Sequence, residues 1–302
     1  MGARKKKQRA RPDTETRAIE SDWRRALENP SVVTTLELDV RQLPAVRFPA
    51  TRRLPSDIAR FVALRELTIH ARNLGALCAE LGQLPRLATL RIDNAERVLE
   101  LGGVFAEMRA LTTLELYNVG LTAPLDLPPT LERLSVEANG SLDLAAWCRS
   151  LRTQERLRAL NIGGCAKVDL PTELSLLTPL HELTATQCEL ARFPDAIFSL
   201  PALRELNLAN NRIAELDPRL IDLTQLQCLW LKGNPLDVSA PWLSRLKSLQ
   251  VLGIDQVPDD VFAQLQAMLP HCTIEMTDNA ARRAEVDRWL RFMGKAAEGD
   301  GA

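Results

Sequence analysis

One pattern of leucines recurs along most of this chain of 302 residues. In each copy an apolar residue is followed three positions later by leucine, and two positions after that usually by Leu, Ile or Val. The copies begin at Val33, Leu64, Leu87, Leu111, Leu131, Leu157, Leu180, Leu203, Leu226 and Leu249. Over the last four intervals the period is 23 residues. A fixed period of this size indicates a solenoid, in which stacked repeats share one core and present a long concave sheet.

The copy that spans residues 203–211 shows how one repeat folds. Leu206 and Leu208 alternate with Glu205 and Asn207, which is the periodicity of a strand with leucines facing inward. Asn211 then turns the chain, because its short amide can bond backbone groups that the turn leaves unpaired. We name this ninth position of the repeat the turn slot. It holds Asn139, Cys165, Cys188, Asn211 and Asn234 in five copies, and Arg41, Arg72, Ala95, Val119 and Val257 in the others.

These patterns predict an α/β fold, a right-handed superhelix with a parallel concave sheet of about ten strands and an irregular or helical convex side. We expect a disordered basic tail over residues 1–12 and a disordered tail over 295–302. Residues 31–276 should form the repeat array. Helical caps should cover its ends at 13–30 and 277–294, because terminal repeats would otherwise expose core. Residues 144–151 should form a convex helix, and an insert of unassigned role runs from Pro44 to Arg53.

The 23-residue form resembles the intracellular class of leucine-rich repeats. Residues 127–139 are similar to the short repeats of bacterial effectors that act inside host cells, and the segment around Trp23, Leu43–Pro44 and Phe48–Pro49 looks like Xanthomonas-type effectors. One group of those effectors carries a ubiquitin-ligase domain after the repeats. Only about 25 residues follow Met276 here, so we expect no such domain.

Composition indicates the cellular compartment in which the chain works. No apolar run approaches the roughly 20 residues that span a bilayer, and no secretory signal peptide is visible. The six cysteines form no closely spaced pairs and are expected as free buried thiols, which favours a reducing, cytoplasmic compartment. The basic run from Arg4 to Arg11 is read as a solvated tail. Its alternatives are a nuclear-localisation or nucleic-acid patch, or a membrane anchor together with Gly2.

We expect no catalytic, cofactor-binding or metal-binding residues. His70, His181 and His271 stand in separate repeats, and there is no glycine-rich phosphate loop or Cys-x-x-Cys pair. Cys228 faces the concave side, but no histidine follows it in the same lane to activate a nucleophile.

The outward positions of the strands are where binding residues are expected. Acidic residues outnumber basic ones there by nine to three, so the face should attract a protein with a basic surface and repel nucleic acid. Trp230 and Tyr117 are typical binding anchors. The alternative is that these polar residues merely solvate the sheet. The candidate partner-binding residues are Arg91, Asp93, Glu115, Tyr117, Arg133, Glu137, Glu182, Thr184, Glu205, Asn207, Trp230 and Lys232.

The sequence therefore favours a monomeric, non-enzymatic protein-binding module, working as an effector inside a host cell. Two alternatives stay open. The chain is either the substrate-recognition part of a ubiquitin ligase or other enzyme complex, or a resident cytoplasmic scaffold.

Overall fold

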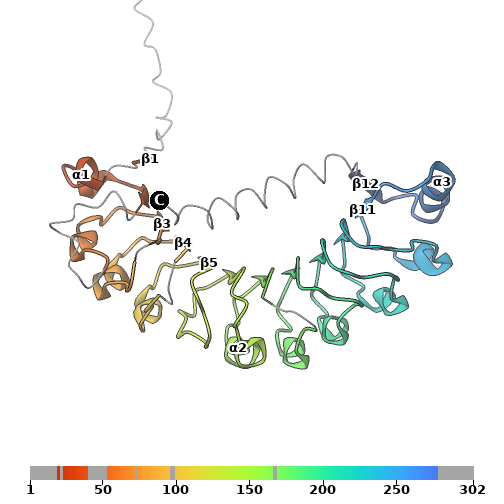
Figure 1. Cartoon of the computed structure of the whole chain (residues 1–302), viewed down its shortest axis with the longest axis horizontal. Helices are drawn as coiled ribbons and strands as arrows, with labels where there is room; N and C mark the ends of the chain where they lie inside the picture. Colours follow the sequence, from red (N-terminus) through yellow and green to blue (C-terminus); the bar gives the residue numbers. More distant parts are fainter. Residues whose placement is uncertain are drawn as a thin grey trace, which may run out of the picture.

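The computed structural model describes residues 19–20, 23–39, 53–72, 74–95, 99–165 and 169–277. Its parallel strands lie side by side along the inner edge of an arc, and the short helices face outward (Figure 1). This confirms the predicted solenoid with a concave parallel sheet. The strands follow one another in chain order as β1 Ile19–Glu20, β2 Thr35–Asp39, β3 Glu66–His70, β4 Thr89–Asp93, β5 Thr113–Tyr117, β6 Arg133–Ser135, β7 Ala159–Asn161, β8 Glu182–Thr184, β9 Glu205–Asn207, β10 Cys228–Trp230, β11 Val251–Asp255 and β12 Thr273–Thr277.

The sheet has 12 strands in the described part of the chain, two more than the leucine pattern predicts. β12 pairs with β11 over five residues, with Ile274 beside Leu252 and Met276 beside Ile254. The pattern misses this strand because His271 stands where the first leucine of a further copy would be. At the other end β1 pairs with the first two residues of β2. An open sheet edge offers unpaired backbone groups, and each added strand satisfies them.

The N-terminal end is therefore less helical than expected over residues 13–30. The described part of that span holds the strand β1, the one-turn helix α1 Trp23–Ala26 and the start of the 3-10 helix η1 Pro30–Val32. Trp23 is buried and its ring centroid lies 5.4 Å from that of Phe61 in the next repeat. The predicted tails, the C-terminal cap over 277–294 except its first residue, and residues 44–52 of the insert lie outside the described residues.

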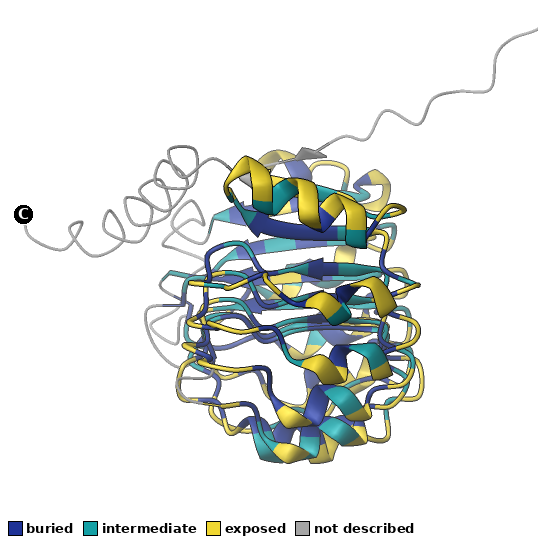
Figure 2. Ribbon diagram, turned by 90° about the vertical axis from the view of Figure 1, so that its right-hand side faces the viewer, coloured by how far each residue is buried: buried dark blue, intermediate teal, exposed yellow. Residues whose placement is uncertain are grey.

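Short helices line the convex side, and their outward faces are exposed (Figure 2). The predicted convex helix is confirmed as α2 Leu144–Leu151, whose first turn is capped by the Asp143 carboxylate accepting from the Ala146 N–H at 2.9 Å. α3 Asp259–Met268 precedes the last strand. The connection from β5 to β6 has no helix, and the other convex helices that the structure describes are 3-10 helices: η3 Ser56–Arg60, η4 Ala79–Gln83, η5 Val104–Glu107, η6 Thr172–Leu176, η7 Asp195–Ser199, η8 Pro218–Asp222 and η9 Pro241–Arg245.

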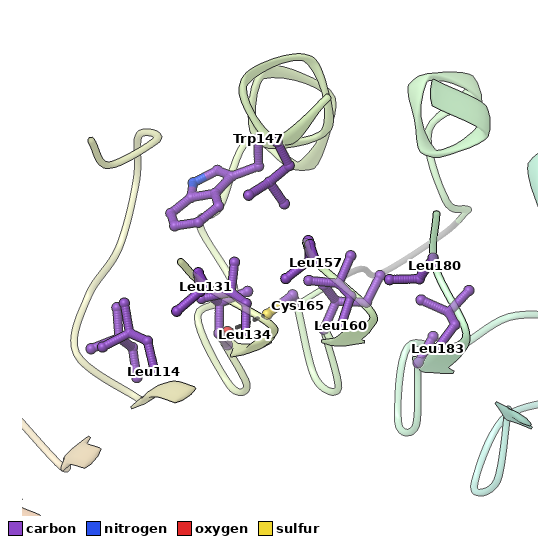
Figure 3. Packing of buried hydrophobic residues seen from close by; sticks show 14 of the residues in the cluster. Leu114, Leu131, Leu134, Trp147, Leu157, Leu160, Cys165, Leu180 and Leu183 are labelled. Carbon is purple, nitrogen blue, oxygen red and sulfur yellow. Dashed lines mark hydrogen bonds between the residues drawn. The ribbon is translucent and has the colours of Figure 1, made fainter. Parts of the chain in front are cut away.

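The core lies between the sheet and these helices. Leu131, Leu134, Leu157 and Leu160 point into that layer from consecutive repeats, and Trp147 reaches down to them from α2 (Figure 3). All are buried. Each repeat thus shares its core with its neighbours, as the stacking argument requires.

Asparagines in the turn slot tie neighbouring repeats together. The Oδ1 atom of Asn139 accepts the N–H groups of Val119 and Leu121, both at 3.1 Å. Its Nδ2 atom donates to the carbonyls of Leu116 and Val136, at 2.9 and 2.8 Å. We call such a bridging side chain a rung. The predicted turn slot is confirmed, because the side chain satisfies backbone groups on both sides of the turn.

Cysteines fill the same slot in two repeats and make weaker rungs. The thiol of Cys165 donates to the carbonyl of Val136 at 2.8 Å, and that of Cys188 donates to the carbonyl of Ile162 at 3.5 Å. A thiol is a weak donor and a weaker acceptor, so these rungs leave out the strong acceptor that asparagine supplies. Burial raises the pKa of Cys165 to about 12, so the thiol is protonated at neutral pH.

Thiol labelling of the native protein should modify two of the six cysteines. Cys228 and Cys272 are partly exposed, whereas the other four thiols are buried. Burial raises the pKa of Cys272 to about 11 and that of Cys228 as well, so both reactions should accelerate as the pH rises. Counting released thiolate from an aromatic disulfide reagent tests this, with the denatured protein as the six-thiol reference. Rapid modification of Cys188 in the native protein would contradict the turn-slot assignment.

Candidate functional site: the concave face

Strand register brings the outward side chains into continuous rows. Across β4 to β8 the central row runs Arg91, Glu115, Ser135, Asn161 and Thr184, each beside the next. Adjacent strands lie about 4.8 Å apart. Side chains far apart in sequence therefore form one surface.

The middle of this surface is hollowed. A concavity of about 280 Å³ spans β4 to β8, and we name it the central hollow. Six of the twelve candidate binding residues line it. They are Arg91, Glu115, Arg133, Glu137, Glu182 and Thr184.

Ion pairs shape the walls of the central hollow. Arg133 donates from its two terminal nitrogens to the two carboxylate oxygens of Glu182, at 3.1 and 2.5 Å. The register places the small side chain of Ala159 between them on β7, which lets the arginine reach across that strand. Arg91 lies 3.3 Å from Glu115. These side chains are half exposed, so each pair contributes little to stability and stays available for exchange with a partner's charges.

Glu137 is the most enclosed carboxylate of the central hollow. Burial raises the pKa of Glu137, and the nearby charge of Glu115 raises it further. A hydrogen bond from Asn161 at 3.1 Å and the charge of Arg91 both lower it. A carboxylate that is enclosed beside a second carboxylate favours a cation nearby. The central hollow is therefore suited to receive a positive group.

A second polar cluster lies toward the N-terminal end of the face, and sequence reasoning missed its centre. The imidazole of His70 lies between two carboxylates, with Nε2 at 2.9 Å from Glu37 and Nδ1 at 2.9 Å from Asp93. Burial alone would lower the pKa of His70, but these two hydrogen bonds and charges raise it overall. The signal was the register of the repeats, which sets His70 beside Asp93 on the next strand.

Trp230 is less exposed than its place on the strand predicts, and its role as a binding anchor stays a prediction. Its indole is partly buried and lies against β11, where a Cβ atom added to Gly253 would come within 2.4 Å of the ring. Its Nε1–H donates to Glu205 at 3.0 Å, and the Lys232 ammonium lies 5.3 Å from the ring centroid. Because Gly253 has no side chain, the Trp230 ring packs against the neighbouring strand within the chain. Trp230, Glu205 and Lys232 form a separate cluster beside the central hollow.

The remaining candidates lie on the same face. Tyr117 is partly buried, and burial, Glu137 and Asp93 raise its pKa. Asn207 stands between Thr184 and Trp230 in the central row and accepts the Ala209 N–H at 3.1 Å. All twelve candidates therefore face the concave side, but only six converge on the central hollow.

The described residues contain no group of three or more His, Cys, Asp or Glu arranged to hold a metal ion. Burial, Glu205 and Glu275 raise the pKa of Cys228, which disfavours its nucleophilic thiolate form. No helix in the described ranges has the length and apolarity needed to cross a membrane.

Comparisons with known proteins agree on the fold. The family model described as leucine-rich repeats (2 copies) matches residues 201–240. No curated protein sequence matches the chain.

Solved structures extend the likeness to most of the chain. An internalin from Listeria monocytogenes is 20% identical, with a TM-score of 0.51 over 80% of this chain and 72% of that one. A chain of the octameric complex of Latrophilin 3, Unc5D and FLRT2 is 18% identical, with a TM-score of 0.53 over 82% of this chain and 83% of that one. A TDR receptor is 19% identical, with a TM-score of 0.51 over 87% and 46%. At these identities the likeness concerns the fold.

Proposed function

We propose that this leucine-rich-repeat solenoid is a protein-binding module without enzymatic activity of its own, and that its partner docks on the central hollow. The observation that carries the proposal is the convergence of Arg91, Arg133, Glu115, Glu137 and Glu182 on one concavity. Concave faces of solenoids are extended binding surfaces. A hollow walled by exchangeable ion pairs offers such a surface a place of specific recognition.

The partner is proposed to present a basic surface. β12 adds Glu275 to the concave face beside Gly253, so ten carboxylates now face three basic side chains there. Each of those three already has a carboxylate neighbour: Arg91 has Glu115, Arg133 has Glu182 and Lys232 has Glu275. The excess is therefore negative, and it steers a basic partner while disfavouring nucleic acid.

Neutralising the central hollow should weaken partner binding about tenfold, chiefly by slowing association. The variant carries Glu115→Gln, Glu137→Gln and Glu182→Gln, which keep side-chain shape while removing charge. Affinity capture from lysate with the unmodified protein supplies the partner, and surface-plasmon measurements at low and high salt compare the two. Association with the unmodified protein should fall as salt rises, and association with the variant should respond less.

The matched control removes three carboxylates elsewhere, with Glu80→Gln, Glu107→Gln and Glu155→Gln. Glu80 and Glu107 lie in η4 and η5, and Glu155 lies in the turn before β7. Equal weakening by both triple variants would mean that net charge alone matters and would remove the central hollow from the proposal.

The biological setting is a separate part of the proposal. Action as an effector inside a host cell is supported by the resemblance of residues 127–139 to effector repeats. A secretion assay on the source organism tests it: retention of the protein in the cell favours a resident scaffold. A ubiquitination assay with candidate ligase components tests the substrate-recognition alternative.

A further inference from the structure

A larger hollow, of about 580 Å³, lies at the edge of the sheet beside the turns that follow β10 and β11. We name it the lateral hollow. Its apolar walls include Leu231, Leu236, Val238 and Val257, and it shares no residue with the central hollow. It is therefore a second concavity with different chemistry.

The lateral hollow lies where the series of rungs ends. The side-chain oxygen of Asn211 accepts the N–H of Leu190 at 3.1 Å, and that of Asn234 accepts the N–H of Ile213 at 2.9 Å. The equivalent donor in the next repeat is the N–H of Leu236, and the turn slot opposite it holds Val257. Valine has no acceptor. Within the described residues the Leu236 N–H has no hydrogen-bond partner.

An early repeat shows that a missing rung can be compensated. There the turn slot holds Ala95, and the equivalent donor, the N–H of Leu74, turns instead to the carbonyl of Ala71 at 2.7 Å. Leu236 makes no such local bond within the described residues, and it is one of the residues that line the lateral hollow. A backbone donor without a protein partner lacks one hydrogen bond, and a ligand acceptor in the lateral hollow would supply it.

The missing rung also defines the acceptors that a ligand would meet. The Nδ2 atom of Asn211 donates to the carbonyls of Ala185 and Leu208, and that of Asn234 donates to those of Leu208 and Leu231. By the same repeat geometry, a rung at position 257 would reach the carbonyls of Leu231 and Ile254. Both residues line the lateral hollow.

One donor and two acceptors in this arrangement are the complement of a primary amide. We propose that the lateral hollow binds the carboxamide of a glutamine side chain from a partner polypeptide, which completes the missing rung. The amide oxygen accepts from the Leu236 N–H and the amide nitrogen donates to the carbonyls of Leu231 and Ile254. The methylene groups of the glutamine pack against Leu236 and Val238. This site is independent of the central hollow.

The test titrates the isotope-labelled full chain with N-acetylglutamine methylamide and follows backbone amide signals by NMR. For a probe of this size we expect a dissociation constant of about 1 mM. The signals of Leu236, Val257 and their neighbours should shift in a saturable way. N-acetylglutamate methylamide, which has the same shape but no amide hydrogens on its side chain, should leave them unchanged.

Two variants at the slot make the test specific. Val257→Asn supplies the rung from within the chain and should abolish the shifts while raising the melting temperature by about 2–4 °C. Val257→Leu fills the same space without polar atoms and should weaken binding, so the test survives if the asparagine variant does not fold. Val62→Asn, at an exposed valine in an early repeat, is the control and should bind the probe unchanged.

Equal shifts with the glutamine and glutamate probes would overturn the proposal, as would shifts that persist in folded Val257→Asn. An absence of site-specific shifts at about 20 mM probe, well above the expected dissociation constant, would also overturn it.

Discussion

Replacing Leu206 with alanine should lower the free energy of unfolding by about 2–5 kcal/mol, because it opens a cavity where repeats share their core. Leu206 is fully buried on β9, with Leu183 beside it on one strand and Leu229 on the other. The lost contacts therefore involve three repeats at once. Denaturant unfolding followed by circular dichroism measures the change.

The matched control is Leu176→Ala. Leu176 lies in η6 and is 42% exposed, so its truncation should change the unfolding midpoint little. An unchanged midpoint for Leu206→Ala would mean that the assigned phase of the repeat is wrong.

Replacing Asn211 with valine should lower the free energy of unfolding by about 3 kcal/mol or more, because it leaves several buried backbone groups without a hydrogen-bond partner. Asn211 accepts the N–H groups of Cys188 and Leu190 at 2.9 and 3.1 Å and donates to the carbonyls of Ala185 and Leu208, both at 2.8 Å. Valine occupies similar space but replaces none of these bonds. The same unfolding measurement applies.

Two further variants show which part of this loss of stability comes from the side chain of Asn211. Asn211→Cys keeps a weak donor and should fall between the wild type and the valine variant. Asn210→Gly, at the exposed neighbour with φ of 57°, should be neutral or slightly stabilising, since glycine adopts this conformation without strain. A cost for Asn211→Val no larger than that for Asn211→Cys would show that a donor in the turn slot contributes nothing.

Much of the fold was accessible from sequence because one physical rule repeats. Leucine alternation sets which face of each strand is buried, and the period sets which residues become neighbours. That rule placed the strands from β2 to β11 and the turn slot. It missed β1 and β12, because these strands carry too little of the leucine pattern. They pair with the ends of the sheet because an open sheet edge favours a further strand.

Only the outline of the candidate site could be predicted from the sequence. Repeat arithmetic put all twelve candidate residues on one face, yet it could not tell which side chains bond one another. Whether Trp230 stays exposed depends on the missing side chain of Gly253, and whether Arg133 reaches Glu182 depends on the small Ala159 between them. The bridging role of His70 required seeing both carboxylates at hydrogen-bond distance.

The two cysteine rungs have a mechanical consequence. Between Asn139 and Asn211 the turns are linked by the thiols of Cys165 and Cys188, which lack the strong acceptor that asparagine supplies. If the stretch between Asn139 and Asn211 is pulled, we expect it to flex first at these two turns, because their links are weaker than the asparagine rungs on either side. β7 and β8, which line the central hollow, belong to these same repeats. A partner bound in that concavity would contact both strands and therefore stiffen this stretch of the arc.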